Sequence, residues 1–276
     1  MYGLQHVPKG RYLLRNAIVF KLSFEGVIGV SIIGGALDAK GTTLWACKLA
    51  GSTDCPNGGA TVNVLVRGVK VNAAGNSPNT DGIHVQLSRN VAIFNTSIKT
   101  GDDSVSIGPG TKELRVEQIT CGPGRGISIG NLAKDLEEEG VQNVTVKNAI
   151  FKGTQNGLRI KSWGRPRNGF VQGAYFLDVV MFNVQNPIVI DQNYYPQNIN
   201  CPAQVSGAKV SDVVYQNILG TSATAVAIKF DCSATNPCSG IRLENVSLTC
   251  RNQEVQSHCA NAIGKIVGTV QPNSCL

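Results

Sequence analysis

The chain has 276 residues, of which 31 are glycine and 16% are charged, and its formal net charge is +7. Many Gly, Val, Ile and Asn residues with few charges favour strands and turns over helices, so we expect an all-β protein. The basic residues are scattered and only 6% of residues are aromatic, which argues against a nucleic-acid partner but leaves an acidic polysaccharide possible.

The N-terminal segment MYGLQHVPKGRYLLR has no apolar core of signal-peptide length before its charges. Apolar runs such as VIGVSII are too short to span a membrane, so we expect no membrane partner. Nine cysteines nevertheless favour an oxidising compartment, and sequons at Asn95, Asn143 and Asn245 agree with secretion. We expect a secreted, extracellular or cell-wall glycoprotein whose leader is missing from this chain.

Short apolar alternations recur along the chain and predict stacked strands. They are VSI (105–107), ISI (127–129), LRI (158–160), IVI (188–190) and VAI (226–228). Each follows a second strand-like segment, namely VAIFNTSI (91–98), LRVEQIT (114–120), VTVKNAIF (144–151), YFLDVVMF (175–182) and VSDVVYQNI (210–218). Two or three short strands per unit with inward aliphatic residues predict a parallel β-helix, a single domain over residues 1–276 that we expect to be monomeric.

Asparagines fall at comparable places within these units and predict an amide ladder at a turn: Asn72, Asn95, Asn148, Asn183 and Asn217. A doubly wound α/β fold would need helices between the strands, and only residues 131–140 (NLAKDLEEEG) have a weak helical pattern. A β-sandwich is the main competing fold, but it would more often show hairpins with Asn-Gly or Asp-Gly turns.

Acidic and basic residues occupy similar positions in four consecutive units. Asp81 lies in NTDGIHV, Asp102 and Asp103 lie in GDDSVSIGPG, and CGPGRGISIGN contains Arg125 among glycines that could let the backbone approach a bound molecule closely. Arg159 and Lys161 share the outer face of one strand about 7 Å apart. Taken singly, the adjacent aspartates are also typical of turns or of half of a calcium site, and Arg159 and Lys161 are also typical of a solvated sheet edge.

Because parallel strands stack about 4.8 Å apart, these side chains should line one groove. A groove with three carboxylates and several cations suits glycoside hydrolysis, in which one carboxylic acid protonates the leaving oxygen and a carboxylate activates water. Crowding of aspartates raises the pKa of at least one of them, which keeps an acid protonated.

The ordered motifs NTDGIHV, GDDSVSIGPG, CGPGRGISIGN, NGLRIKSW and IVIDQNYYP strongly resemble those of plant polygalacturonases of glycoside hydrolase family 28, especially the pollen-type exopolygalacturonases. The resemblance implies a right-handed parallel β-helix and inverting hydrolysis of α-1,4-galacturonan in pectin, without a metal or other cofactor. It also implies site roles: Asp102 as general acid, Asp81 and Asp103 holding the water, Arg159 and Lys161 binding the substrate carboxylate, and Tyr194 contacting substrate.

Several departures from the family pattern suggest reduced activity. Arg125 stands where the family normally has histidine, and arginine cannot exchange a proton near neutral pH. It would still attract galacturonate. Ser104 replaces a family cysteine that usually bridges to the one matching Cys121, so Cys121 is predicted to be unpaired. We read His84 as structural.

The chain also reads as shortened relative to the family. Its first strand-bearing segment is missing, and coils are absent where IVFK meets LSFEG and where ATVNVL meets VRGVKVN. Missing coils would remove stacking interfaces. Local bridges are expected for Cys232 with Cys238 and Cys250 with Cys259, and Cys47 with Cys55 is plausible, although sequence does not fix connectivity.

The functional reading that we favour is a hydrolase of exo type, impaired by Arg125. The first alternative is a catalytically inactive pectin-binding pseudoenzyme. The second is a pectate lyase that uses arginine as base and calcium held by aspartates, which the order of the motifs disfavours.

Overall fold

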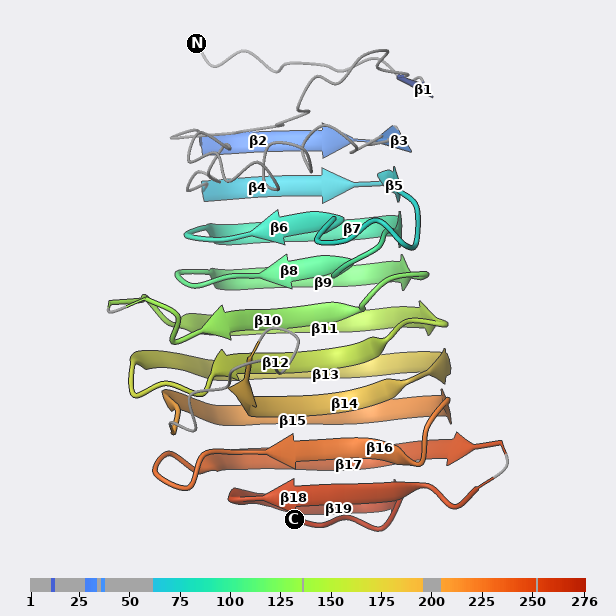
Figure 1. Cartoon of the computed structure of the whole chain (residues 1–276). Helices are drawn as coiled ribbons and strands as arrows, with labels where there is room; N and C mark the ends of the chain where they lie inside the picture. The colour runs from blue at the N-terminus through green and yellow to red at the C-terminus, as the bar shows by residue number, and fades with distance from the viewer. Residues whose placement is uncertain are drawn as a thin grey trace.

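The computed structural model describes residues 62–276 apart from 136, 196–204 and 252, together with the backbone of residues 11–12, 28–33 and 36–37. These residues form strands that stack along one axis, with β1 at one end and β18 and β19 at the other (Figure 1). No helix long and apolar enough to cross a membrane occurs in the described part of the chain. The predicted all-β class is confirmed.

All strand pairs are parallel and belong to two sheets. The seven-stranded sheet has the order β6-β8-β10-β12-β14-β16-β18. Its strands are β6 (Ile83–Val85), β8 (Val105–Ile107), β10 (Ile127–Leu132), β12 (Asn156–Trp163), β14 (Asn186–Tyr194), β16 (Val226–Asp231) and β18 (Gln256–Ala260).

The twelve-stranded sheet has the order β1-β3-β5-β7-β9-β11-β13-β15-β17-β19, and β4 pairs with both β2 and β7. Its longer strands are β7 (Arg89–Lys99), β9 (Lys112–Cys121), β11 (Val141–Lys152), β13 (Asn168–Val184), β15 (Gly207–Ser222), β17 (Cys238–Cys250) and β19 (Ala262–Gln271). The first strands are β1 (Arg11–Tyr12), β2 (Ile28–Ile33), β3 (Ala36–Leu37), β4 (Val62–Arg67) and β5 (Lys70–Asn72). The architecture is the predicted parallel β-helix.

The core fills the space between the two sheets with stacked apolar side chains. The first and third residues of the first four predicted trios face the core and are at most 1% exposed. The third residues, Ile107, Ile129, Ile160 and Ile190, pair with one another on successive coils. The fifth trio was placed wrongly, because the partner of Ile190 is Phe230 and Ile228 pairs with Ile188. The trio of this coil is therefore Ile228-Lys229-Phe230.

The long strands of the larger sheet share one position at which a residue adopts a left-handed conformation, and most of them contain a second such residue. Six residues in adjacent register occupy this position with φ between 48° and 55°: Asn95, Gln118, Asn148, Asp178, Asn217 and Asn245. Asn tolerates this region better than most residues, and Asn217 Nδ2 donates to Asp178 Oδ1 at 2.8 Å. Three of the five predicted members, Asn95, Asn148 and Asn217, occupy this row. Asn72 pairs with Lys99 instead, and Asn183 follows Asp178 in the same strand with a separate left-handed conformation of φ 53°.

The described residues of 131–140 form no helix. Residues 131 and 132 belong to β10, and the Glu138 carboxylate accepts hydrogen bonds from the backbone N–H groups of residues 133–135. The expected junction between ATVNVL and VRGVKVN lies within β4, which pairs regularly with β7, while the junction near IVFK lies outside the described residues.

The disulfide pattern is partly as expected. Cys232 bonds to Cys238, and Cys121 is a buried free thiol. The expected Cys250–Cys259 bridge is wrong, because Cys259 bonds to Cys275 from the C-terminal segment and Cys250 is free. Cys47 and Cys55 lie outside the described residues.

Candidate active site

The three aspartates come together beside the seven-stranded sheet. Asp81 precedes β6, while Asp102 and Asp103 precede β8 on the next coil. One carboxylate oxygen of each lies within 4.8 Å of the others. A direct pairing of β6 with β8 produces this proximity, since Ile83 pairs with Val105. The predicted cluster of carboxylates is therefore present in the structure.

Asp103 is the most enclosed of the three and is held by three donors. Its side chain is 3% exposed, and its Oδ1 accepts hydrogen bonds from Ser128 Oγ at 2.7 Å and from Arg159 at 3.0 Å. Lys161 Nζ lies 2.9 Å from the other oxygen. Arg159 and Lys161 share one face as predicted, and in this structure both bind the protein's own carboxylate.

Arg125 is placed over Asp102 by a close approach between coils. Its Nη1 lies 3.5 Å from Asp102 Oδ2, and its backbone N–H donates to the carbonyl of Asp102 at 2.7 Å. A Cβ on Gly124 would lie 2.9 Å from that same carbonyl, and one on Gly126 would lie 2.0 Å from the carbonyl of Asn156. The glycines thus permit close contact with neighbouring coils.

Asp81 has no lysine or arginine partner among the described residues. Burial, followed by the charges of Asp103 and Asp102, raises the pKa of Asp81 to about 7. The imidazole of His84 lies 3.9 Å from this carboxylate and has hydrogen-bond contacts with Ser106 and Gln86. A proton is therefore retained in the aspartate cluster at mildly acidic pH.

Tyr194 closes one side of this group at the end of β14. Lys161 Nζ lies 5.5 Å from the centre of the Tyr194 ring, a cation–π distance. Burial raises the pKa of the Tyr194 hydroxyl, and burial, followed by the Arg159 charge, lowers the pKa of Lys161. The seven predicted site residues thus lie along one side of the stack, over β6 to β14.

Sequence reasoning missed Ser128 and interpreted His84 as structural rather than as a neighbour of Asp81. Ser128 is fully buried and bridges Asp103 and the Nε of Arg159, and His84 lies beside Asp81. Register supplies the missing signal, because His84, Ser106, Ser128 and Arg159 are cross-strand neighbours in one outward row.

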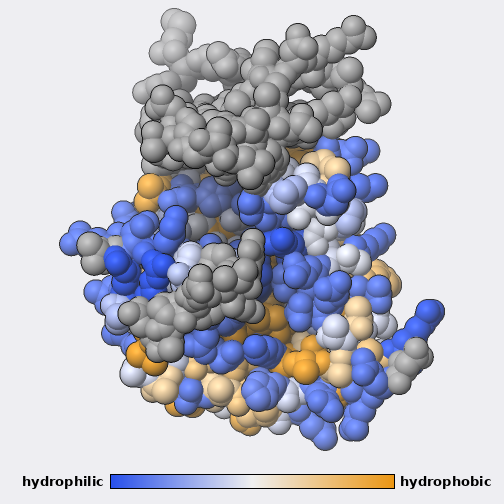
Figure 2. Space-filling model, viewed as in Figure 1, coloured by the Kyte–Doolittle hydropathy of each residue, from blue (hydrophilic) through white to orange (hydrophobic). Residues whose placement is uncertain are grey.

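In the space-filling view hydrophilic residues predominate over the described upper and middle coils, while hydrophobic residues gather nearer the C-terminus (Figure 2).

Comparison with known proteins agrees with this geometry. Residues 58–269 match the family described as "Glycosyl hydrolases family 28". A polygalacturonase of Prunus persica is 48% identical over 99% of this chain and 85% of its own length, and an exopolygalacturonase of Oenothera organensis is 43% identical over 77% of this chain and 59% of its own. The chain spans about half of some other relatives, such as 49% of a polygalacturonase of Medicago sativa.

The alignment with the peach protein spans 333 positions, although this chain has 276 residues. The relative therefore has internal segments that this chain lacks, in keeping with the expected missing coils.

Solved structures show the same fold at low sequence identity. An endo-xylogalacturonan hydrolase from Aspergillus tubingensis has a TM-score of 0.70 at 21% identity and covers 88% of this chain and 81% of its own. Endopolygalacturonase I from Stereum purpureum, solved with two galacturonate units, has a TM-score of 0.62 at 22% identity and covers 88% of this chain and 68% of its own. The fold is the right-handed parallel β-helix, and the chain belongs to glycosyl hydrolases family 28 as a glycoside hydrolase of the polygalacturonase type.

Proposed function

We propose that this protein binds pectin and hydrolyses α-1,4 bonds between its galacturonate units. The observation that carries the proposal is the cluster of three aspartates within 4.8 Å beside the basic pair Arg159 and Lys161, in a chain of this family. Carboxylates supply the acid and base for glycoside hydrolysis, and the cations complement the sugar carboxylate. No cofactor takes part in the proposed reaction.

The proposed mechanism inverts the anomeric carbon. Asp102 gives its proton to the glycosidic oxygen as the bond from that oxygen to C1 breaks. A water oriented by Asp81 and Asp103 attacks C1 from the opposite face and passes a proton to the carboxylate that accepts it. Because the nearest aspartate oxygens are closer than the carboxyl separation usual for inverting enzymes, the anomer formed first must be measured directly by proton NMR.

Arg125 reduces turnover in this proposal. Arginine cannot exchange a proton near neutral pH, so Arg125 cannot share the proton that Asp102 has to transfer. The guanidinium at 3.5 Å from Asp102 still attracts a polyanion. Loss of a general acid-base contributor costs about 10²- to 10⁴-fold in rate.

Exo-type action is the further part of this proposal, supported by the similarity to the Oenothera exopolygalacturonase. The enzyme would then release monomeric galacturonate from chain ends. We also propose that residues 1–276 form one secreted, monomeric domain, in keeping with the disulfides.

The competing proposal is a pseudoenzyme that binds pectin without cleaving it, favoured by the same Arg125–Asp102 ion pair. Retention on polygalacturonate that weakens with salt and with Arg159→Ala, without any product, would establish it. Equal retention of a neutral glucan would contradict the electrostatic basis of both proposals. A lyase would instead form an ultraviolet-absorbing unsaturated product, lost on adding a calcium chelator.

The deciding experiment incubates the purified protein with polygalacturonate and separates the products by anion-exchange chromatography. Monomeric galacturonate from the wild type, absent from Asp102→Asn, is the expected result. If neither the wild type nor Arg125→His forms product while both still bind polygalacturonate, the hydrolase proposal is wrong and the pseudoenzyme proposal is supported.

A further inference from the structure

A cationic side chain on an aromatic support lies just past the predicted substrate-binding pair. Strand β12 ends at Trp163, and the guanidinium carbon of Arg165 lies 4.4 Å from the centre of the Trp163 ring and 5.7 Å from that of Tyr195. The two rings meet edge to face at 4.9 Å. Arg165 is therefore held by cation–π contacts.

This cluster is continuous with the aspartate site. The Trp163 ring also meets the Tyr194 ring edge to face, with 6.0 Å between the ring centres. Lys161 Nζ in turn lies 5.5 Å from the centre of the Tyr194 ring. A contact path thus runs from Asp103 through Lys161, Tyr194 and Trp163 to Arg165. Arg165 lies one ring beyond the residues already placed in the site.

Arg165 differs from the other cations of the site because its guanidinium is not paired with a carboxylate of the described residues. Arg159 and Lys161 bind Asp103, and Arg125 pairs with Asp102. Within the described ranges Arg165 has no acidic partner, and its side chain makes one long hydrogen bond, of 3.5 Å, to the Tyr195 hydroxyl. A guanidinium supported on a ring keeps in-plane N–H donors for a carboxylate.

The next coils along the stack do not continue the row of cations. Val189 is the neighbour of Arg159, and Asp191 is the neighbour of Lys161. On the coil after that, Lys229 is paired with Asp231 at 3.3 Å. A polyanion that extends from Lys161 along the stacking axis therefore meets acidic groups. One that extends past the end of β12 meets the positive charge of Arg165.

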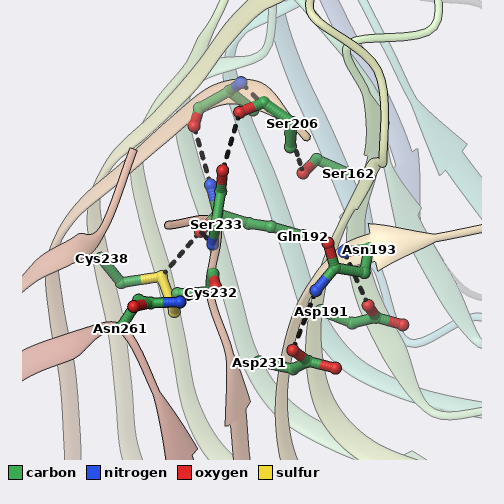
Figure 3. The surroundings of a disulfide bond; sticks show 11 residues. Ser162, Asp191, Gln192, Asn193, Ser206, Asp231, Cys232, Ser233, Cys238 and Asn261 are labelled. Carbon is green, nitrogen blue, oxygen red and sulfur yellow. Dashed lines mark hydrogen bonds between the residues drawn. A yellow bond between two sulfur atoms is a disulfide. The ribbon is translucent and has the colours of Figure 1, made fainter. Parts of the chain in front are cut away.

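Buried polar contacts fix the strand ends that bear this cluster. Ser162, between Lys161 and Trp163, shares a hydrogen bond of 3.0 Å with Ser206. Gln192, two residues before Tyr194, donates to the carbonyl of Ala208 at 2.7 Å and accepts from the backbone N–H of Ser233 at 2.9 Å. Figure 3 shows Ser162, Ser206, Gln192 and Ser233 gathered next to the Cys232–Cys238 disulfide. Such support gives a binding residue a defined position.

We propose that Arg165, held by Trp163 and Tyr195, binds the carboxylate of a second galacturonate unit, one sugar further from the reacting bond than the unit bound by Arg159 and Lys161. The inference rests on the proposed function, because it extends the same substrate site. It predicts a site that recognises at least two consecutive uronic-acid units on this side and disfavours a neutral or methyl-esterified sugar at the second position.

The test measures dissociation constants by isothermal titration calorimetry for galacturonate oligomers from dimer to hexamer. Binding is compared in Asp102→Asn protein, which leaves the ligands uncleaved. Adding Arg165→Gln should weaken binding of the longer oligomers about tenfold, as expected for one charged hydrogen-bonded contact, and should leave the shortest bound oligomer unchanged. The slope of affinity against salt should decrease in parallel.

Arg167→Gln is the matched control, since it removes the same charge two residues further on and should bind like the parent. Arg165→Lys should recover only part of the affinity, because lysine lacks the planar fork. Parent binding with no change in Arg165→Gln would overturn the assignment of Arg165 alone. Absence of galacturonate binding by the parent and by the wild-type protein would overturn the proposed function itself.

Discussion

Arg125 Nη1 lies 3.5 Å from Asp102 Oδ2, so the residue that departs from the family pattern contacts the carboxyl to which we assign the acid role. Replacing Arg125 by His should remove a fixed positive charge and supply a group that titrates near neutral pH. We expect at least a tenfold rise in reducing-sugar release from polygalacturonate. Arg125→Gln, which removes the charge without adding a titrating ring, should give a smaller gain, and no gain in Arg125→His would argue against arginine as the cause of low activity.

The raised pKa of Asp81 predicts how stability varies with pH. The pKa of Asp81 is about 7 in the folded protein, against 3.8 for an ordinary aspartate, so the native state binds more protons than the unfolded state between these two values. The free energy of unfolding should therefore decrease as pH rises through this range, and the contribution from protonated Asp81 should be lost above pH 7. The side chain is 32% exposed, and screening by solvent limits the effect to about 1 kcal/mol.

Urea unfolding of Asp81→Asn and wild type at pH 4 and pH 8 checks this prediction. Asn mimics the protonated side chain, so the two proteins should have similar stability at pH 4, and the variant should be the more stable at pH 8. A variant that is less stable than wild type at pH 8 would contradict the electrostatic reading.

Asp103 should matter more for stability than Asp102. Asp103→Asn leaves Arg159 and Lys161, 13% and 8% exposed, without their carboxylate, and an uncompensated buried charge costs about 3–5 kcal/mol. Asp102→Asn should cost less than about 1 kcal/mol, because its partner Arg125 is 42% exposed. Chemical denaturation at neutral pH measures both, and equal losses would disprove the ranking.

The two described free cysteines should differ in reactivity. Burial raises the pKa of the Cys121 thiol to about 12, and a thiol in this state is a poor nucleophile. Iodoacetamide should label Cys250 in the native protein and Cys121 only after unfolding, as read by peptide mass spectrometry. Native labelling of Cys121 at the rate of Cys250 would show that the interior opens readily.

The left-handed conformation at Asn217 should tolerate glycine better than alanine. Its φ is 54°, which costs a residue with a Cβ about 1–2 kcal/mol. Asn217→Ala should lose that amount and also the hydrogen bond to Asp178, whereas Asn217→Gly should lose less. Thermal unfolding of the two variants measures the difference, and an equal or larger loss for glycine would remove conformational strain as the reason for the asparagine ladder.

The sequence by itself determined the all-β repeat and the side-chain faces. Alternation with a period of two fixed Leu158 and Ile160 inside and Arg159 and Lys161 outside, because successive residues of a strand point to opposite sides of the sheet. The order of the motifs placed Asp81, Asp102 and Asp103 on neighbouring coils.

Only the tertiary structure decided which residues meet across coils, since register and pairing depend on contacts between residues far apart in the chain. It paired Ile190 with Phe230 and Cys259 with Cys275, and it directed Arg159 and Lys161 to Asp103. The hydrogen bond between Arg165 and Tyr195 joins residues that are 30 positions apart in the chain. Local alternation specifies a side chain's face, whereas loop lengths and packing along the stack specify its neighbours.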